Sequence, residues 1–274
     1  MSAATPTTPS IATNGPGIPF TRLVAVEWRK MVDTVAGRWL MIVTALIMVL
    51  AIVGMLLAVA LDDDFAPTAN AFSSVLQLLV LLLAPVLAIM VITSEWGQRT
   101  HLTAFTLEPR RTRVLGAKFG AVILFALATL ALALVLGAAG NAATSLFDRD
   151  VVWDLSVSDL AWAVFLQFAL ILSAFALGLL VLNTAAAVAI FYVAAIVLRF
   201  IVYPILMGFF GWFVDLAPFL DVFFGFAVAA DGMDLDGDAI DGIARFAPLV
   251  SSLTLWLVIP GVIGTWRATR AEVK

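Results

Sequence analysis

Six long runs with few or no charged residues alternate with polar segments along the chain. Each run has about 20 residues, which is the length that a helix needs to cross about 30 Å of hydrocarbon. None shows the strict alternation of apolar and polar residues that is typical of a membrane barrel strand. The pattern therefore predicts six transmembrane helices, at residues 39–61, 71–92, 119–140, 160–182, 184–204 and 246–266.

The segment before the first run has two parts. Residues 1–17 are rich in Ser, Thr, Pro, Ala and Gly and carry no charge, which predicts a disordered tail. Over 18–37, apolar residues recur at steps of three and four while charged residues occupy another face. This spacing predicts a cytoplasmic amphipathic helix that begins at Pro19 and ends near Gly37.

The segment 205–245 is also rich in aromatic residues, but it does not read as a seventh span. Asp215, Pro218 and Asp221 interrupt it, and each half is too short to cross a membrane. We expect an external loop whose two short helices re-enter the outer leaflet before the last span.

Composition supports a membrane protein and excludes several kinds of chemistry. The chain of 274 residues is 63% hydrophobic and 12% charged, with a mean hydropathy of +1.10, which predicts an all-α integral membrane protein. It contains no cysteine, so disulfides, thiol nucleophiles and cysteine metal sites are excluded, and its one histidine, His101, has no second histidine as a partner for a metal site within one chain. No G-x-x-x-x-G-K-[ST] sequence occurs, so we expect no nucleotide site, no catalytic residue and no metal site.

Charge is segregated between the two sides of the predicted membrane domain. Twelve of the fifteen Lys and Arg residues lie before the first run, between the second and third, or after the sixth, and these regions should be cytoplasmic. The remaining loops hold fourteen of the nineteen acidic residues, all of them aspartates. We therefore expect both termini inside, with residues 267–274 forming a short cytoplasmic tail.

A few polar residues in apolar surroundings are candidates for a translocation path. Arg199 is the one charged residue inside a predicted span, where it either snorkels to the outer headgroups or lines a path for an anionic substrate. Gln77 and Gln167 either form hydrogen bonds between helices or contact substrate. Asp234, Asp236 and Asp238 have the spacing of a calcium loop, but Ala239 stands where such a loop needs glycine.

The segment 93–118 concentrates polar residues between two spans and has the form of a cytoplasmic projection that contacts a partner. It reads S-E-W-x-x-x-T and then E-P-R-R-x-R-V-L-x-A-K, after an N-terminal helix that carries EWRK. Two later spans are split by a short N-T turn, and a long outer loop precedes the final span. With this order, residues 18–270 resemble the short six-helix bacterial form of the type-2 permease family of ATP-binding-cassette (ABC) exporters.

The resemblance implies a coupling loop over 93–118 that docks onto a separate ATPase subunit, with the N-terminal helix touching the same partner or the inner membrane surface. The helix residues with this role would be Glu27, Trp28, Arg29 and Lys30. The partner-docking residues would be Glu95, Arg99, Thr100, His101, Glu108, Pro109, Arg110 and Arg113.

The resemblance also implies the assembly and its location. Two permease copies, as a homodimer, would work with two cytoplasmic ABC ATPase subunits in the bacterial plasma membrane, in contact with membrane lipids and with no nucleic acid. ATP and Mg would bind to the ATPase, and this chain would bind no cofactor. Its function would be ATP-driven efflux, and the apolar spans and aromatic outer loop favour an amphipathic cargo. The alternative is a secondary transporter or a structural membrane subunit that is not powered by ATP.

Overall fold

The computed structural model describes residues 18–97 and 110–270. Within these ranges the chain is helical, apart from short connections and one isolated bridge between Met233 and Ala239. Six helical segments are long and apolar enough to cross a membrane, which confirms the predicted helical membrane architecture. They are Val35–Leu61, Ala69–Trp96, Arg111–Phe147, Val157–Val181, Thr184–Phe209 and Gly242–Arg270.

The first four spans are regular helices and the last two are composite. The regular spans are α2 (Val35–Leu61), α3 (Ala69–Gly97), α5 (Arg111–Ala143, followed by a 3-10 turn, Thr144–Phe147) and α6 (Val157–Val181). The fifth consists of α7 (Thr184–Tyr192), a π-helical stretch (Val193–Val202) and α8 (Tyr203–Phe209). The sixth consists of a 3-10 turn (Gly242–Phe246), α11 (Ala247–Leu253), a π-helical turn (Thr254–Val258) and α12 (Ile259–Arg270).

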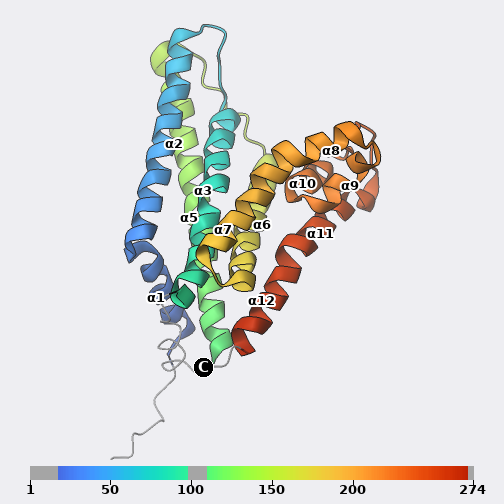
Figure 1. Cartoon of the computed structure of the whole chain (residues 1–274). Helices are drawn as coiled ribbons and strands as arrows, with labels where there is room; N and C mark the ends of the chain where they lie inside the picture. The colour runs from blue at the N-terminus through green and yellow to red at the C-terminus, as the bar shows by residue number, and fades with distance from the viewer. Residues whose placement is uncertain (1–17, 98–109, 271–274) are drawn as a thin grey trace, which may run out of the picture.

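Helices α3 and α6 form the centre of the bundle. More than half of each apolar window is buried, 56% for α3 and 61% for α6, whereas only 11% of the window in α2 is buried. Helix α3 packs against both α5 and α6, and α12 packs against α6. Figure 1 shows α2, α3 and α5 side by side, with α12 on the other side of α6. The core therefore lies between α3 and α6, and α2 is left with a wide apolar surface.

Helix α1 (Phe20–Asp33) lies at the end of the bundle where α3 ends and α5 begins (Figure 1). The helix ends earlier than the predicted position near Gly37, because the chain breaks at Thr34. The Thr34 hydroxyl accepts a hydrogen bond from the Gly37 amide at 3.1 Å and caps α2. A Cβ atom at Gly37 would stand 2.0 Å from the Met31 carbonyl oxygen, so this position in the first turn of α2 requires glycine.

The apolar side of α1 packs onto α5. An added Cβ at Gly116 would lie 3.5 Å from the Phe20 ring, and one at Gly120 would lie 3.1 Å from a Val24 methyl group. The small residues of α5 therefore form the surface on which α1 rests. A helix is thus present in the predicted region, and part of its apolar side contacts the protein itself. Its place at the inner membrane surface stays a prediction.

Two short helices follow the fifth span within the segment 205–245, and their re-entry into the outer leaflet stays a prediction. Helices α9 (Trp212–Leu220) and α10 (Val222–Asp231) are bent by 101° at the break between them. Helix α8 continues the fifth span beyond the predicted end at residue 204. The bent pair lies with α8 and the start of the last span, away from the end that carries α1 (Figure 1).

Candidate functional site

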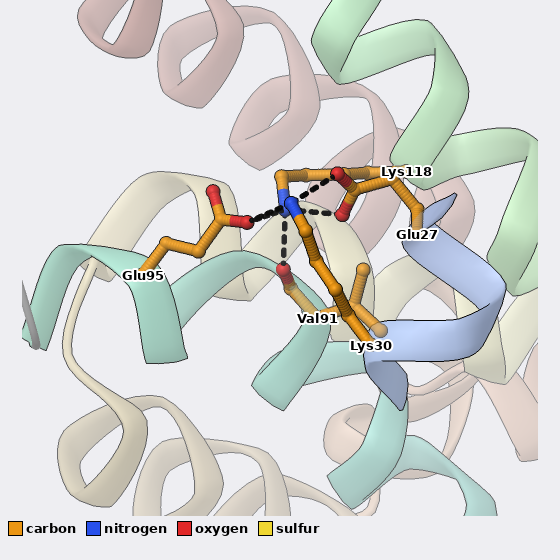
Figure 2. Close-up of polar contacts among 5 residues, drawn as sticks. All are labelled: Glu27, Lys30, Val91, Glu95 and Lys118. Atoms are coloured by element: carbon orange, nitrogen blue, oxygen red, sulfur yellow. Dashed lines mark hydrogen bonds and ion pairs between the residues drawn. The ribbon is translucent and has the colours of Figure 1, made fainter. Parts of the chain in front are cut away.

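Four charged side chains meet where α1, α3 and α5 converge. Glu27 and Lys30 come from α1, Glu95 from the last turns of α3 and Lys118 from the first turns of α5 (Figure 2). The Lys118 Nζ atom lies 2.7 Å from Glu27 Oε2 and 3.0 Å from Glu95 Oε1. The Lys30 Nζ atom lies 2.7 Å from Glu27 Oε1 and 2.8 Å from Glu95 Oε1. We call these four residues the ionic cluster.

Burial makes the pairing within the ionic cluster energetically important. Lys118 is 4% exposed and Glu27 is 6% exposed, so neither charge is well solvated. An ammonium group has three donors, and Lys118 uses them on Glu27, Glu95 and the Val91 carbonyl oxygen at 3.1 Å. Two carboxylates and two ammonium groups also leave no net charge. The cluster is thus neutral and the Lys118 donors are all satisfied, which is the condition under which buried charges are tolerated.

The helices aim these side chains toward one another. Glu27 and Lys30 are three residues apart and therefore share one face of α1. Val91 and Glu95 are four residues apart on α3, so the Val91 carbonyl and the Glu95 side chain both approach Lys118. The ionic cluster consequently joins α1, α3 and α5 at the point where the chain leaves α3 toward the polar segment 98–110.

The predicted docking residues have different surroundings. Glu27 and Glu95 each pair with Lys30 and Lys118, and Arg29 and Arg110 lie at exposed positions. The remaining described residues of the predicted set are Trp28, which packs against the main hydrophobic core, and Arg113, which donates to the Ile18 carbonyl oxygen at 2.8 Å. The predicted residues Arg99, Thr100, His101, Glu108 and Pro109 lie outside the described part of the chain.

The polar segment is shorter than the predicted loop over 93–118. Helix α3 continues to Gly97 and α5 begins at Arg111, so Glu95 and Lys118 are helical residues. Sequence reasoning missed Lys118 as a site residue. The available signal was a single lysine within an otherwise apolar stretch of α5, where a charge requires a buried partner.

The ionic cluster shifts the pKa of Lys30. Burial opposes its charge, but hydrogen bonds to Glu27 and Glu95 and the attraction of their carboxylates outweigh burial and raise the pKa above 10.5. Because the folded-state pKa is the higher one, the stabilisation by Lys30 is complete below about pH 10.5 and is lost as the pH rises through the folded-state value.

We therefore expect the stability difference between the unmodified chain and Lys30→Gln to stay constant up to about pH 10.5 and to shrink above it. The Lys30 side chain is 44% exposed, so the difference at neutral pH should be only about 0.2–1 kcal/mol. Detergent-induced unfolding, followed by tryptophan fluorescence at several pH values, measures it. A difference that grows above about pH 10.5 would contradict the assignment.

A second buried charge pair lies near the bent helices. Arg199, in the π-helical stretch, donates through Nε to Asp221 Oδ1 at 3.1 Å and through Nη2 to both carboxylate oxygens at 2.9 Å. Its guanidinium carbon lies 3.6 Å from the centre of the Phe223 ring. The Arg199 guanidinium group thus binds a carboxylate within the protein, and snorkelling to lipid headgroups stays an untested alternative. Its predicted place on a translocation path stays a prediction.

Asp221 has two roles in this arrangement. Besides binding Arg199, its Oδ1 atom accepts hydrogen bonds from the Phe223 and Phe224 amides at 2.8 and 3.1 Å and caps α10. The residue is 4% exposed. A cavity of about 30 Å³ beside the pair has room for little more than one water molecule. The pair therefore attaches the fifth span to the bent helices.

The two predicted glutamines connect helices. Gln77 of α3 donates to the Ala163 carbonyl of α6 at 2.6 Å. Gln167 of α6 donates to the Ala126 carbonyl at 2.7 Å and to the Thr129 hydroxyl at 3.0 Å, both on α5. The interhelical interpretation of these residues therefore agrees with the structure. A contact with substrate stays a prediction for both.

The aspartates of the outer loop form a turn of their own. Asp234 Oδ1 accepts from the Asp236 amide at 3.1 Å and from the Asp238 amide at 2.7 Å. In the described part of the chain, no group of three or more His, Cys, Asp or Glu residues could hold a metal ion. The calcium-loop spacing thus coincides with a hydrogen-bonded turn.

A scan against protein-family models found no match to this chain, and a search of curated proteins found none either. The functional assignment therefore depends on the residues themselves and on their geometry.

Proposed function

We propose that this chain is the membrane-spanning permease subunit of an ATP-driven ABC exporter of the type-2 permease family. A separate cytoplasmic ATPase would dock onto the polar segment 98–110 and the adjoining surface of α1. The observation that carries the proposal is the ionic cluster, because it ties together the three helices that surround the exit of this segment. A projection that receives mechanical force from a partner needs such a rigid base.

The ionic cluster would transmit motion of the docked segment into the membrane. Helix α3 is central and packs against α6, while α5 continues across the bundle from the same end. A force applied between α3 and α5 would be shared with α1 through Lys118 and Glu27 rather than dissipated by local unfolding. ATP binding to two ATPase subunits would in this way tilt helices in two permease copies and open a path between them.

The charge distribution supports an orientation for the assembly. The end that carries α1, the start of α5 and the end of α12 contains most of the basic residues, so it would face the cytoplasm of a bacterial cell. Both termini would then be cytoplasmic, and α1 would lie along the inner membrane surface. Helices α9 and α10 would re-enter the outer leaflet from outside.

Replacing Arg110 with alanine tests the docking surface. The side chain is exposed at the start of α5, and guanidinium groups often dominate the energy of protein interfaces. We expect ATP hydrolysis by the purified complex to fall about tenfold, while membrane insertion and expression stay unchanged.

Asp64→Ala is the control for this variant. Asp64 is exposed near the opposite end of the bundle, after α2, where a cytoplasmic ATPase could not reach it in the proposed orientation. The control should hydrolyse ATP like the unmodified complex. Normal hydrolysis by the Arg110→Ala complex would refute the docking assignment.

A further inference from the structure

A groove of about 520 Å³ lies between α3, α6 and α10, at the end of the bundle opposite to the ionic cluster. Its volume lies within the range that holds a drug-sized molecule. Its lining combines polar residues of α3 and the start of α6 with aromatic residues of α6 and α10. A binding site for an amphipathic molecule needs both polar and apolar lining residues.

The charge of the groove has one sign. Among the described residues, Asp159 and Asp231 are the charged ones in its lining, and no described lysine or arginine lines it. The Asp159 carboxylate is already stabilised at the start of α6, where it forms a capping box with Ser156. Asp231 is the last residue of α10, and within the described residues no hydrogen bond or ion pair engages its carboxylate. A negative charge at a helix C-terminus is electrostatically unfavourable and attracts cations. The Arg245 guanidinium group stands nearby, beside Gly232, but forms no ion pair with Asp231 in the described part of the chain.

A buried polar group in the same lining also lacks a partner. Ser73 of α3 is 5% exposed, and its Oγ atom has no hydrogen-bond partner in the described part of the chain. Buried hydroxyl groups without a partner are uncommon, because the loss of hydration is not compensated. The Oγ atom is closed off from the groove, however, and faces the position of Gly137 on α5, so it belongs to the contact between α3 and α5 and does not select a ligand.

Aromatic rings line the groove beside these polar groups. The Trp162 ring contacts the Phe226 ring edge to face, with centres 5.4 Å apart and an interplanar angle of 89°. Both residues line the groove, together with Phe223. Aromatic faces attract organic cations, most strongly when a carboxylate stands close by and water is partly excluded.

We propose that this groove binds an amphipathic organic cation, with its charged group at Asp231 and its apolar body against Trp162 and Phe226. As the substrate class of an exporter, this inference rests on the proposed function. Binding itself requires only the chain. A second large cavity, between α5, α6 and α12, holds about 620 Å³, but its described lining residues are mainly apolar and include no charged one, so they offer no selection for a cation.

The test uses the full chain in nanodiscs of zwitterionic lipid, with radiolabelled tetraphenylphosphonium as the probe and empty nanodiscs as background. We expect saturable binding at one site per chain. Neutral triphenylphosphine oxide, which has a similar aromatic body, should compete at least about tenfold more weakly because it lacks the charge. Equal competition by the neutral compound, or no saturable binding, would overturn the proposal.

Two variants locate the site. Asp231→Asn and Trp162→Leu should each weaken binding about tenfold, the first by removing the charge and the second by removing the aromatic face. Asp241→Asn is the matched control, because Asp241 is also exposed in the segment after α10 but does not line the groove. Asp231→Asn should not destabilise the fold, since it removes a charge at a helix C-terminus. Unchanged binding in both variants would overturn the proposal.

These outcomes are separate from those of the exporter proposal, since the binding assay contains no ATPase and no ATP. Loss of the cation site would leave ATP-driven export in place for another cargo. If the chain bound the cation saturably but had no ATPase partner, the cation-site proposal would stand and the proposal of ATP-driven export would be rejected.

Discussion

Replacing Lys118 with methionine is expected to lower the free energy of unfolding by about 3–5 kcal/mol. The substitution removes a buried ammonium group that binds Glu27, Glu95 and the Val91 carbonyl oxygen. Of the two ammonium groups in the cluster, only the half-exposed one of Lys30 would then face the two carboxylates, and Glu27 is 6% exposed. Methionine has a similar length, so the loss of unfolding free energy would arise from removal of the charge and not from a cavity. Detergent-induced unfolding followed by tryptophan fluorescence measures the change.

Two further variants separate the charge effect from general damage. Arg29→Gln changes an exposed charge on the same helix α1 and should alter stability by less than about 0.5 kcal/mol. The double variant Glu27→Gln with Lys118→Met restores the neutrality of the cluster and should recover a large part of the loss. If the loss in the double variant equalled the sum of the two single losses, the cluster would not be an interacting charge network.

Replacing Asp221 with asparagine is expected to cost a similar amount, about 3–5 kcal/mol. Asparagine can still cap α10, so the variant retains the hydrogen bonds to the Phe223 and Phe224 amides. It removes the negative charge that faces Arg199, whose side chain is 11% exposed. An uncompensated guanidinium in this position must either stay buried at high cost or pull the fifth span away from the bent helices.

The control for Asp221→Asn is Asp215→Asn, which changes an exposed aspartate on α9 and should leave stability within about 0.5 kcal/mol of the unmodified chain. Arg199→Met combined with Asp221→Asn should be more stable than Asp221→Asn alone, because no charge remains unpaired. Limited proteolysis of the loop after α10 gives a second readout, since loosening of the bent helices should speed cleavage. Unchanged stability and cleavage for Asp221→Asn would show that the pair does not hold these helices.

The apolar runs located all six spans because a membrane-crossing helix must present about 20 residues without unpaired charge. They did not locate the helix ends. Helix α5 begins at Arg111 rather than at residue 119, since backbone hydrogen bonding continues outside the hydrocarbon, where charged residues cost little. The break at Thr34 was likewise missed, because apolar residues continue at steps of three and four through it. The turn becomes evident only from the close approach of Gly37 to Met31.

The candidate sites were predictable only in part. The sequence showed three of the charges beside apolar segments, namely Glu27, Lys30 and Glu95. It did not show that they contact Lys118, which is 91 positions away from Glu27. Asp221 read as an interruption of a hydrophobic segment, and its pairing with Arg199 follows from how the bent helices fold back toward the π-helical stretch. Pairing of this kind depends on tertiary packing, which a single sequence with several candidate partners for each charge does not specify.

The central claim, an ATP-driven permease powered by a separate subunit, is tested most directly by purification of the tagged chain from its native operon in mild detergent. Mass spectrometry identifies stoichiometric partners, and an ATPase assay follows. We predict a co-purifying P-loop ATPase that is lost when residues 98–109 are replaced by a Gly-Ser segment of equal length. A chain that purifies without such a partner would contradict the claim and favour a secondary transporter or a structural membrane subunit.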